Sequence, residues 1–430
     1  MDNSEKIFEA FKRFASISTD SRQIKENSIF FALSGDTFNG NKFAADALQS
    51  GAAMAVVDDA SYVKGDDYIL VDDSLEALQK LATDYRKSLS ATILGITGSN
   101  GKTTTKELIS AVLTTEKNTV STQGNFNNHI GVPLSVLSLK TDTEIGVIEM
   151  GANHIGEIES LCKIANPDVG LITNIGKAHL EGFGSYEGVI KAKNELYLAI
   201  KDSEGELLLN EDDDLLRELG SGINSFSYGS AYADVNGRII QTNPTLVIEW
   251  VWNDKPYLIK SKLYGNYNFP NIMAAIAAGL YFSIKPANIC RAIEDYKPNN
   301  NRSQQVKTNR NKLILDAYNA NPVSMRNALK SFKDFNANNP VLILGDMFEL
   351  GDDAAAEHKS IIDQILDLGF KDVFLLGEEF YKFKESNNRF TFFRRTPEMK
   401  NFLLENQPEG KTILIKGSRG MKLESLVELL

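Results

Sequence analysis

The sequence ILGITGSNGKTTTKELISAVL, residues 93–113, has the pattern of a strand, a glycine-containing loop and a helix. Gly98 and Gly101 allow tight turns and let backbone N–H groups approach a phosphate, while Lys102 can reach the β and γ phosphates and Thr103 can bind Mg²⁺. The usual loop has one more glycine, five positions before Gly101, so this is a shortened variant. Because a strand and a helix flank the loop as phosphate binding requires, the stretch predicts an ATP or GTP site on a parallel α/β sheet.

The chain divides into three regions with different sequence patterns, and this loop lies in the second. Residues 1–88 alternate short strands with helices, which is typical of an α/β unit. Residues 89–298 contain nearly continuous apolar runs, as a covered parallel sheet requires, with an antiparallel excursion at 226–264. A polar stretch at 297–305 indicates a linker, and residues 299–430 carry strands and helices of their own. We therefore predict three α/β domains: an N-terminal one, a central P-loop domain with a parallel sheet, and a C-terminal Rossmann-like one.

Composition indicates a globular protein and excludes several classes. The chain has 430 residues, of which 24% are charged, and a formal net charge of −11. This acidic balance argues against a nucleic-acid partner, which usually needs a basic field. Cys162 and Cys290 are too few and too far apart for a disulfide framework or a zinc pattern. The sequence has no run of about 18 apolar residues for a membrane span and no signal-peptide core. We expect a cytoplasmic monomer without membrane insertion.

Two candidate metal ligands follow buried strands. Glu149 ends the apolar run EIGVIEM, and His179 lies just beyond the run VGLITNI. Parallel strands bring their carboxyl ends to one edge of the sheet, so Glu149 can bind the Mg²⁺ that Thr103 also reaches. For His179, a role in the site and a purely structural role are both open.

The helix predicted from GVIKAKNELY, residues 188–197, carries two lysines that face opposite ways. Lys193 shares an apolar face with Val189. Lys191 lies about 200° away around the helix, where it is placed to pair with Glu195 on the solvent side. Lys193 is therefore either a buried amine that tends towards its neutral form or a lysine whose ammonium extends to the surface.

Seven stretches that occur in order over nearly the whole chain point to a family: TGSNGKTT, TQGNFNNHIGVPLS, EMGANHIGEI, TNIGKAHLEGFGS, KAKNE, GNYNFPNIMAAIA and LDAYNANPVSMRNAL. In this order they resemble the Mur ligases, the ATP-dependent amide-bond-forming enzymes of peptidoglycan synthesis. The stretches DSRQIKENSIFFALSGDTFNGNKF, HLEGFGS, YNANPVSM, LGDMFELG and IKGSRGMKLE are similar to those of the members that join D-alanyl-D-alanine to UDP-N-acetylmuramoyl-tripeptide.

The resemblance implies a reaction in which ATP phosphorylates the terminal carboxylate of the tripeptide and the amine of the dipeptide then attacks it. It implies Lys102, Glu149, His179 and Lys193 as catalytic residues. It also implies two Mg²⁺ sites, with Thr103, Glu149, His179 and Lys193 as the metal ligands and a CO₂-derived carbamate on Lys193.

The resemblance further implies which residues contact each substrate. For ATP they are Gly98, Ser99, Asn100, Gly101, Lys102, Thr103, Thr104, Asn268, Asn271, Arg302 and Asp316. For the UDP-sugar-peptide they are Asp20, Ser21, Arg22, Ser34, Gly35, Asn125, Asn127 and Asn128, and for the dipeptide Tyr318, Asn319 and Asn321. The family often has histidine where Asn41 and Tyr267 stand. We expect hinges near residues 88–91 and 297–302 and closure of the domains on substrate binding.

Three other functions fit the sequence less well than a ligase of this kind. Another Mur or folylpolyglutamate-type amide ligase is disfavoured by the stretches YNANP and GDMFELG. A non-catalytic nucleotide-binding regulator is disfavoured because every implied catalytic position holds a chemically competent residue. A P-loop GTPase would need an Asn-Lys-x-Asp guanine signature near a strand end, which the sequence lacks.

Overall fold

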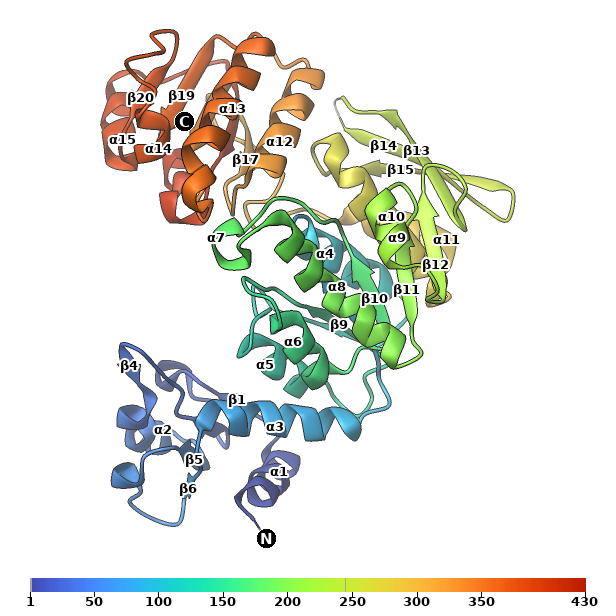
Figure 1. The fold of residues 1–430 in the computed structure, drawn as a ribbon, viewed down its shortest axis with the longest axis vertical. Coiled ribbons are helices and arrows are strands. Elements are labelled where there is room, and N and C mark those ends of the chain that lie inside the picture. The colour runs from blue at the N-terminus through green and yellow to red at the C-terminus, as the bar shows by residue number, and fades with distance from the viewer. Residues whose placement is uncertain (1, 244) are drawn as a thin grey trace.

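The computed structural model describes residues 2–243 and 245–430. In these residues the strands form sheets of four, nine and six strands, together with a two-stranded hairpin. Figure 1 shows the three large sheets in three bodies that follow one another in chain order, from the blue N-terminal body to the red C-terminal one. The predicted three-domain α/β class is confirmed, while the boundaries 1–88, 89–298 and 299–430 stay predictions.

The N-terminal sheet is parallel, with the strand order β1-β2-β5-β6. Its strands are β1 (Ile17–Ser18), β2 (Ile29–Phe31), β5 (Met54–Val57) and β6 (Tyr68–Leu70); the hairpin is β3 (Ser34–Gly35) and β4 (Phe38–Asn39); the helices are α1 (Asn3–Phe14), α2 (Ala44–Gln49) and α3 (Ser74–Lys87). Successive side chains of β2 point to opposite faces. Phe30 packs in a cluster with Ala44 and Ala47 of α2, whereas Ile29 and Phe31 belong to the cluster formed with α1 and α3.

The central sheet has the strand order β15-β14-β13-β12-β11-β10-β7-β9-β8. Its strands are β7 (Thr92–Thr97), β8 (Thr119–Ser121), β9 (Ile145–Glu149), β10 (Val169–Ile172), β11 (Glu206–Asn210), β12 (Ser225–Gly229), β13 (Val235–Gln241), β14 (Leu246–Trp252) and β15 (Lys255–Ser261). Its helices are α4 (Lys102–Leu113), α5 (Gly131–Leu137), α6 (Glu157–Ala165), α7 (Leu180–Phe183), α8 (Tyr186–Asp202), α9 (Asp214–Leu219), α10 (Phe269–Tyr281) and α11 (Pro286–Asp295). The predicted antiparallel excursion is confirmed in β13, β14 and β15, whereas β12 pairs in parallel with β11.

Strand β7, which leads into the phosphate-binding loop, is buried on both faces. Leu94 and Ile96 pack in one cluster with α4 and α10, while Ile93 packs in another cluster with α6 and α8. This double cover explains the nearly continuous apolar runs of the neighbouring strands. It also leaves the carboxyl ends of β7, β9 and β10 as the polar edge of the sheet.

The C-terminal sheet has the strand order β16-β17-β21-β18-β19-β20 and is parallel except for β16, which pairs antiparallel at one edge. Its strands are β16 (Gln304–Lys307), β17 (Lys312–Asp316), β18 (Pro340–Gly345), β19 (Asp372–Leu376), β20 (Thr391–Phe393) and β21 (Thr412–Lys416); its helices are α12 (Pro322–Asp334), α13 (Ala354–Asp367), α14 (Glu378–Tyr381) and α15 (Thr396–Glu405). A parallel sheet between helices agrees with the Rossmann-like prediction. The stretch predicted as a linker, residues 297–305, ends within β16.

Helix α3 joins the N-terminal body to the central one. Asp73 caps its first turn by accepting hydrogen bonds from two backbone N–H groups. At the other end, the buried guanidinium of Arg86 donates 2.9 Å bonds to the carbonyl of Ala165 and to the carboxylate of Asp168. The apolar face of α3 lies in a hydrophobic cluster that continues into α5 and α6, so the two bodies share a core. Within the described ranges, no helix has the length and apolar character needed to cross a membrane.

Candidate active site

A cavity of about 1640 Å³ lies where strand ends of two sheets face each other. From the central sheet it is lined by the loop after β7, by Glu149 at the end of β9 and by the segment after β10. From the C-terminal sheet it is lined by Asp316 at the end of β17 and Lys416 at the end of β21. Open α/β sheets bind their ligands at the carboxyl ends of the strands, and here two such edges enclose one volume.

The phosphate-binding loop has the backbone that its glycines permit. Gly98 and Gly101 have φ angles of 143° and 81°, a region that disfavours residues with a Cβ atom. A Cβ at Gly98 would lie 2.1 Å from the Thr173 hydroxyl. Lys102 follows directly and donates a 2.6 Å hydrogen bond back to the carbonyl of Gly98. Burial lowers the pKa of Lys102, while the nearby carboxylate of Glu149 opposes that shift.

Glu149 has the surroundings of a metal-binding carboxylate. It is 1% exposed, and its Oε1 accepts hydrogen bonds from the Thr103 hydroxyl at 3.1 Å and from the Asn127 amide at 2.8 Å. Its Oε2 is buried and has no hydrogen-bond partner among the described residues. An unpaired buried carboxylate oxygen is costly. A cation beside the hydroxyl of Thr103 would remove that cost, so the residues present fit a Mg²⁺ ion here.

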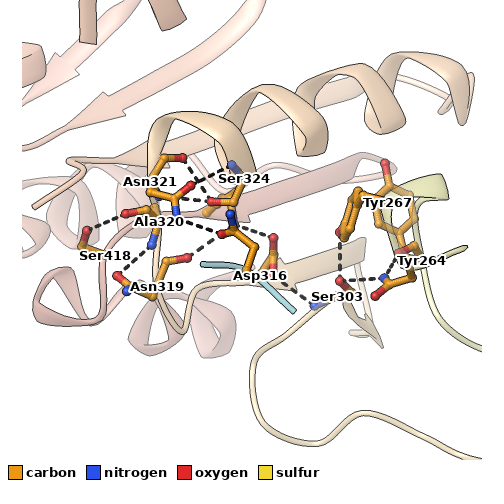
Figure 2. Close-up of polar contacts among 12 residues, drawn as sticks. Tyr264, Tyr267, Ser303, Asp316, Asn319, Ala320, Asn321, Ser324 and Ser418 are labelled. Carbon is orange, nitrogen blue, oxygen red and sulfur yellow. Dashed lines mark hydrogen bonds and ion pairs between the residues drawn. The ribbon is translucent and has the colours of Figure 1, made fainter. Parts of the chain in front are cut away.

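Asn268 and Asn271, two of the predicted ATP contacts, belong to a connected chain of hydrogen bonds beside the loop. The Asn271 carbonyl accepts from the Thr105 hydroxyl at 3.1 Å, and its amide donates to Asn268 at 2.9 Å. Asn268 in turn donates to the Ser303 hydroxyl at 3.2 Å. Tyr267, one of the positions where the family often has histidine, bonds the same Ser303 hydroxyl at 2.9 Å (Figure 2). The chain therefore runs from helix α4 to the start of the C-terminal body.

Lys193 lies on the apolar face of α8, as the helical projection predicted, and of the two alternatives that the sequence left open it is the buried one, with 2% of its surface exposed. Its Nζ lies 5.4 Å from the centre of the Phe183 ring. Burial lowers the pKa of Lys193 well below its usual value, and the positive charge of Lys102 adds to this effect. Lys193 therefore tends towards the neutral amine, which is the form that reacts with CO₂.

The predicted pairing of Lys191 with Glu195 is wrong. Lys191 is exposed as expected, but Glu195 is only 8% exposed. Its carboxylate accepts hydrogen bonds from the N–H groups of Gly156 at 2.6 Å and Glu159 at 3.0 Å. These groups lie at the start of α6, where a helix presents unpaired N–H donors and a positive dipole. The projection of α8 alone could not show that another helix begins against this face.

His179 lies in the segment after β10, at the start of α7, with a φ angle of 52°. Its ring centre is 6.5 Å from that of Phe183, the ring that Lys193 also approaches. Its Nδ1 contacts the Glu349 carboxylate, which belongs to the C-terminal body. This contact lowers the pKa of Glu349. His179 thus lines the cavity, and the residue that its ring contacts, Glu349, belongs to the C-terminal body.

The described residues contain no group of three carboxylate, imidazole or thiol side chains placed to hold a metal ion. Any ligand set at this edge must therefore include other chemistry. The hydroxyl of Thr103 supplies it beside Glu149. Lys193 is not among the residues that line the cavity; its amine binds no cation as it stands, whereas a carbamate on that amine would be a carboxylate-like ligand.

The C-terminal wall of the cavity is built around two strand ends. Asp316 accepts a 2.6 Å hydrogen bond from Lys416, which is 2% exposed, and a 3.2 Å bond from the backbone N–H of Ser303. The guanidinium of Arg302 lies 3.7 Å from the centre of the Tyr318 ring, and its Nε is buried without a partner among the described residues. Asp316 and Arg302 therefore both line the cavity, as predicted.

The predicted asparagines line the cavity, but several of their side chains already form hydrogen bonds with the backbone. Asn319 accepts from the N–H of Ala320 at 2.9 Å, and Asn321 caps α12 (Figure 2). Asn128 accepts from the N–H of Gly131 at 2.9 Å at the start of α5. Tyr318, Asn125 and Asn127 line the same cavity.

Five of the residues predicted to contact the UDP-sugar-peptide, all in the N-terminal body, lie elsewhere. Asp20 and Arg22 form an ion pair at 2.8 Å beside Ser21, and Arg22 lowers the pKa of Asp20 to about 2. Ser34 and Gly35 form strand β3. None of these five lines the large cavity. Asn41, where the family often has histidine, is 3% exposed; its amide donates a 2.6 Å bond to Asp58.

Sequence reasoning missed two residues that the structure places at this site. Lys416 follows a predicted strand, TILIKGS, and could have been found as a charged residue at a strand end. Glu349 lies in a loop of the C-terminal body, and no local pattern predicts its contact with His179. Together these features define a P-loop α/β protein whose nucleotide-binding edge is completed by a second sheet.

Known protein families match the chain in three consecutive regions. Residues 13–86 match the Mur ligase family, catalytic domain; residues 96–279 match the Mur ligase middle domain; residues 301–419 match the Mur ligase, glutamate ligase domain.

Named relatives agree over nearly the whole chain. The UDP-N-acetylmuramoyl-tripeptide--D-alanyl-D-alanine ligase of Bacillus subtilis is 37% identical over 96% of this chain and 92% of its own. The crystal structure of MurF from Acinetobacter baumannii superposes with a TM-score of 0.87 at 30% identity, covering 96% of this chain and 92% of that one. The crystal structure of MurF from Thermotoga maritima in complex with ADP superposes with a TM-score of 0.85 at 26% sequence identity and covers 96% of both chains. The chain belongs to the Mur ligase family.

Proposed function

We propose that this chain is the ATP-dependent ligase that joins D-alanyl-D-alanine to UDP-N-acetylmuramoyl-tripeptide, giving the UDP-linked pentapeptide of peptidoglycan synthesis and hence serving cell-wall growth, cell shape and division. One observation carries the proposal: the phosphate-binding loop, Glu149 and the C-terminal residues Asp316, Asn319 and Asn321 line a single cavity. A ligase that activates a carboxylate and then adds an amine needs the nucleotide and both substrates in one enclosed volume. Full-length similarity to named ligases of this activity supports it.

ATP binds along the carboxyl edge of the central sheet. Backbone N–H groups of the loop and the start of α4 hold the phosphates, and Lys102 neutralises their charge. The proposed contacts are Gly98, Ser99, Asn100, Gly101, Lys102, Thr103, Thr104, Asn268, Asn271, Arg302 and Asp316. The structure of the Thermotoga maritima relative is a complex with ADP, which supports nucleotide binding by this chain.

Two metal sites are proposed beside the phosphates. Thr103 and Glu149 would hold one Mg²⁺, and His179 and carbamylated Lys193 would hold the other. When bound, these cations would supply positive charge where two anions must meet, the γ phosphate and the substrate carboxylate. The buried, neutral-leaning amine of Lys193 and the unpartnered Oε2 of Glu149 support this assignment.

The reaction runs in two steps. A carboxylate oxygen of the tripeptide attacks the γ phosphorus of ATP, the bond to ADP breaks, and an acyl phosphate forms. The amine of D-alanyl-D-alanine then attacks the acyl carbon, loses a proton, and expels phosphate that keeps the oxygen from the carboxylate. Lys102 holds the charge that develops on the transferring phosphoryl group.

The remaining residues position the substrates. The UDP-sugar-peptide would be held by Asp20, Ser21, Arg22, Ser34, Gly35, Asn125, Asn127 and Asn128. The dipeptide would be held by Tyr318, Asn319 and Asn321. Because the N-terminal candidates lie outside the large cavity, the long UDP-linked substrate would extend from the N-terminal body to the phosphate-binding loop. We place the enzyme in the cytoplasm, where ATP and nucleotide-linked sugars are available.

Phosphate release tests the proposal. The protein is mixed with ATP, Mg²⁺, the UDP-linked tripeptide and D-alanyl-D-alanine, and each component is omitted in turn. We expect release only in the complete mixture. Release that does not depend on both substrates would refute the assignment.

A further inference from the structure

Five lysine and arginine side chains line the large cavity among the described residues. Three of them have a partner: ATP is the proposed partner of Lys102 and Arg302, and Lys416 forms a 2.6 Å ion pair with the carboxylate at the end of β17. The other two are Lys177, in the segment after β10, and Arg326, on α12. Charges across a binding site complement one another, so these two cations point to an anion of a substrate.

These two cations lie side by side although they come from different bodies. Gly176 packs against the first turn of α12, because a Cβ atom on it would lie 3.4 Å from a methyl group of Val323. Lys177 follows Gly176 directly. Arg326 lies three residues after Val323 and so on nearly the same face of α12. The Lys177 ammonium is 3.7 Å from one oxygen of the Glu357 carboxylate, and the Arg326 guanidinium contacts the other oxygen.

The three side chains leave one positive charge unbalanced, and that charge faces the cavity. Glu357 is 8% exposed and lies outside the cavity lining, whereas Lys177 and Arg326 belong to it. Arg326 uses only Nη2 for its bonds to Glu357 and to the Ser360 hydroxyl, and 33% of its side chain is exposed. A guanidinium carries five N–H donors in a planar fork, which suits a second carboxylate.

We propose that Arg326, together with Lys177, binds the free carboxylate of the dipeptide, so that the site selects D-alanyl-D-alanine with an unblocked C-terminus. This inference rests on the proposed function and adds two binding residues to it. The dipeptide must bring its amine to the acyl phosphate while its carboxylate enters the same enclosed volume. A carboxylate taken out of water without a partner is costly, and a cation not occupied by ATP removes that cost.

The position of Arg326 along α12 fits the length of the dipeptide. Asn321, which caps this helix, donates a hydrogen bond to Asn100 of the phosphate-binding loop and so marks the reacting end. Arg326 lies five residues further, roughly 7.5 Å along the helix axis at about 1.5 Å per residue. An extended dipeptide spans roughly 7 Å. With its amine beside Asn321, the dipeptide would therefore bring its carboxylate to Arg326.

A pair of substrates tests the charge on the ligand, and a variant tests the charge on the protein. The substrates are D-alanyl-D-alanine and its C-terminal amide, which has no carboxylate. We expect the wild-type KM to be about 10- to 100-fold higher for the amide, the usual effect of losing a hydrogen bond between charged groups. In Arg326→Gln the KM for the dipeptide should rise by a similar factor, and the KM for the amide should change little. Lys177→Gln should shift the dipeptide KM in the same direction by less.

A matched control lies one turn further along the same helix. Lys330 is exposed and outside the cavity lining, so Lys330→Gln removes an equal charge and should keep the wild-type KM for both substrates. Because Arg326→Gln also takes a partner from the buried Glu357, thermal melts accompany the kinetics. Arg326→Lys keeps the positive charge without the planar fork; it should fold like the wild type and show an intermediate KM for the dipeptide.

The inference is overturned if the wild type uses the dipeptide and its amide with equal KM. It is also overturned if Arg326→Gln and Arg326→Lys raise the KM for the UDP-linked tripeptide, which is anionic as well, and leave that for the dipeptide unchanged.

Saturation-transfer NMR of the dipeptide, with the tripeptide and the non-hydrolysable ATP analogue AMPPNP present, separates this inference from the proposed function. Binding that needs both Arg326 and the free carboxylate, in a protein that releases no phosphate, refutes only the ligase assignment. An active wild type that binds the dipeptide and its amide equally refutes only the role of Arg326. A wild type that neither binds the dipeptide nor releases phosphate refutes both.

Discussion

The amide of Asn321, at the start of α12, donates a 2.8 Å hydrogen bond to the side-chain oxygen of Asn100 in the phosphate-binding loop. The carbonyl of the same Asn321 side chain accepts a 2.9 Å bond from the N–H of Ser324 and so caps the helix. The Asn321 side chain therefore caps α12 of the C-terminal body and also links that body to the phosphate-binding loop.

Substitutions at Asn321 should separate these two roles. Asp caps helices as well as Asn, so Asn321→Asp should keep the thermal stability but place a negative charge where the amide met Asn100. We expect the KM for ATP to rise about tenfold, which corresponds to about 1.4 kcal/mol. Asn321→Ala should also cost about 1 kcal/mol of stability through the lost cap. Thermal melts and ATP titrations measure both effects; a wild-type KM in Asn321→Asp would show that the bond to Asn100 is dispensable.

Lys193 and Lys191 form a matched pair on one helix. Lys193→Ala removes the proposed carbamate, and we expect the ligase rate to fall by at least about 10²-fold, the usual effect of losing one charge-stabilising group. Short carboxylic acids added to the assay should restore part of the rate by taking the place of the carbamate. Lys191→Ala, at the exposed position, should keep the wild-type rate. Near-normal turnover in Lys193→Ala would exclude Lys193 from the metal site.

How far the sequence could predict this site depended on whether the determining contacts were local. The phosphate-binding loop and the position of Lys193 on the apolar face of its helix follow from residue spacing within one loop or helix, so both were predicted. The sequence left open whether the Lys193 side chain is buried, and the structure shows that it is. The role of Glu195 depends on a helix that begins more than 30 residues earlier. The contact of Glu349 with His179 depends on how two domains meet. Such contacts leave no periodic signal in one sequence.

The same limit applied to the fold. Apolar runs predicted the buried strands of the central sheet, and the change of sequence character over residues 226–264 predicted its antiparallel edge. The insertion of β21 between β17 and β18 is different, because it pairs Thr412 with Lys312, 100 residues earlier, and with Pro340, 72 residues earlier. Alternation of strands and helices indicates a parallel sheet but does not fix the order of its strands.

The ion pair of Asp20 with Arg22 predicts a pH dependence in the N-terminal body. The pKa of Asp20 is lowered from 3.8 to about 2, mainly by the hydrogen bond from the Arg22 side chain. A lowered carboxyl pKa stabilises the fold above the unfolded value of 3.8, and that contribution is lost as the pH falls through about 2. An NMR titration should place the Asp20 midpoint near 2 and, in Arg22→Ala, closer to 3.8. The Asp59 carboxyl, which Ser61 contacts instead, should titrate alike in both proteins; an unmoved Asp20 midpoint would refute the pairing.

Domain closure is a further expectation, with hinges near residues 88–91 and 297–302. The second hinge is tied to helix α4, because the amide of Asn300 donates 3.0 Å bonds to the carboxylate of Glu107. We expect X-ray scattering to show a smaller radius of gyration when an ATP analogue and both substrates are present together than with any of them alone. Identical profiles in all of these mixtures would count against closure.

The route of one oxygen atom shows whether the amide forms through an acyl phosphate. In the proposed reaction, a carboxylate oxygen of the tripeptide attacks ATP and leaves with the phosphate. With both oxygens of that carboxylate labelled as ¹⁸O, mass spectrometry should find one ¹⁸O in each phosphate released and one in the new amide. Pentapeptide formed together with unlabelled phosphate would contradict the acyl-phosphate reaction proposed for this cavity.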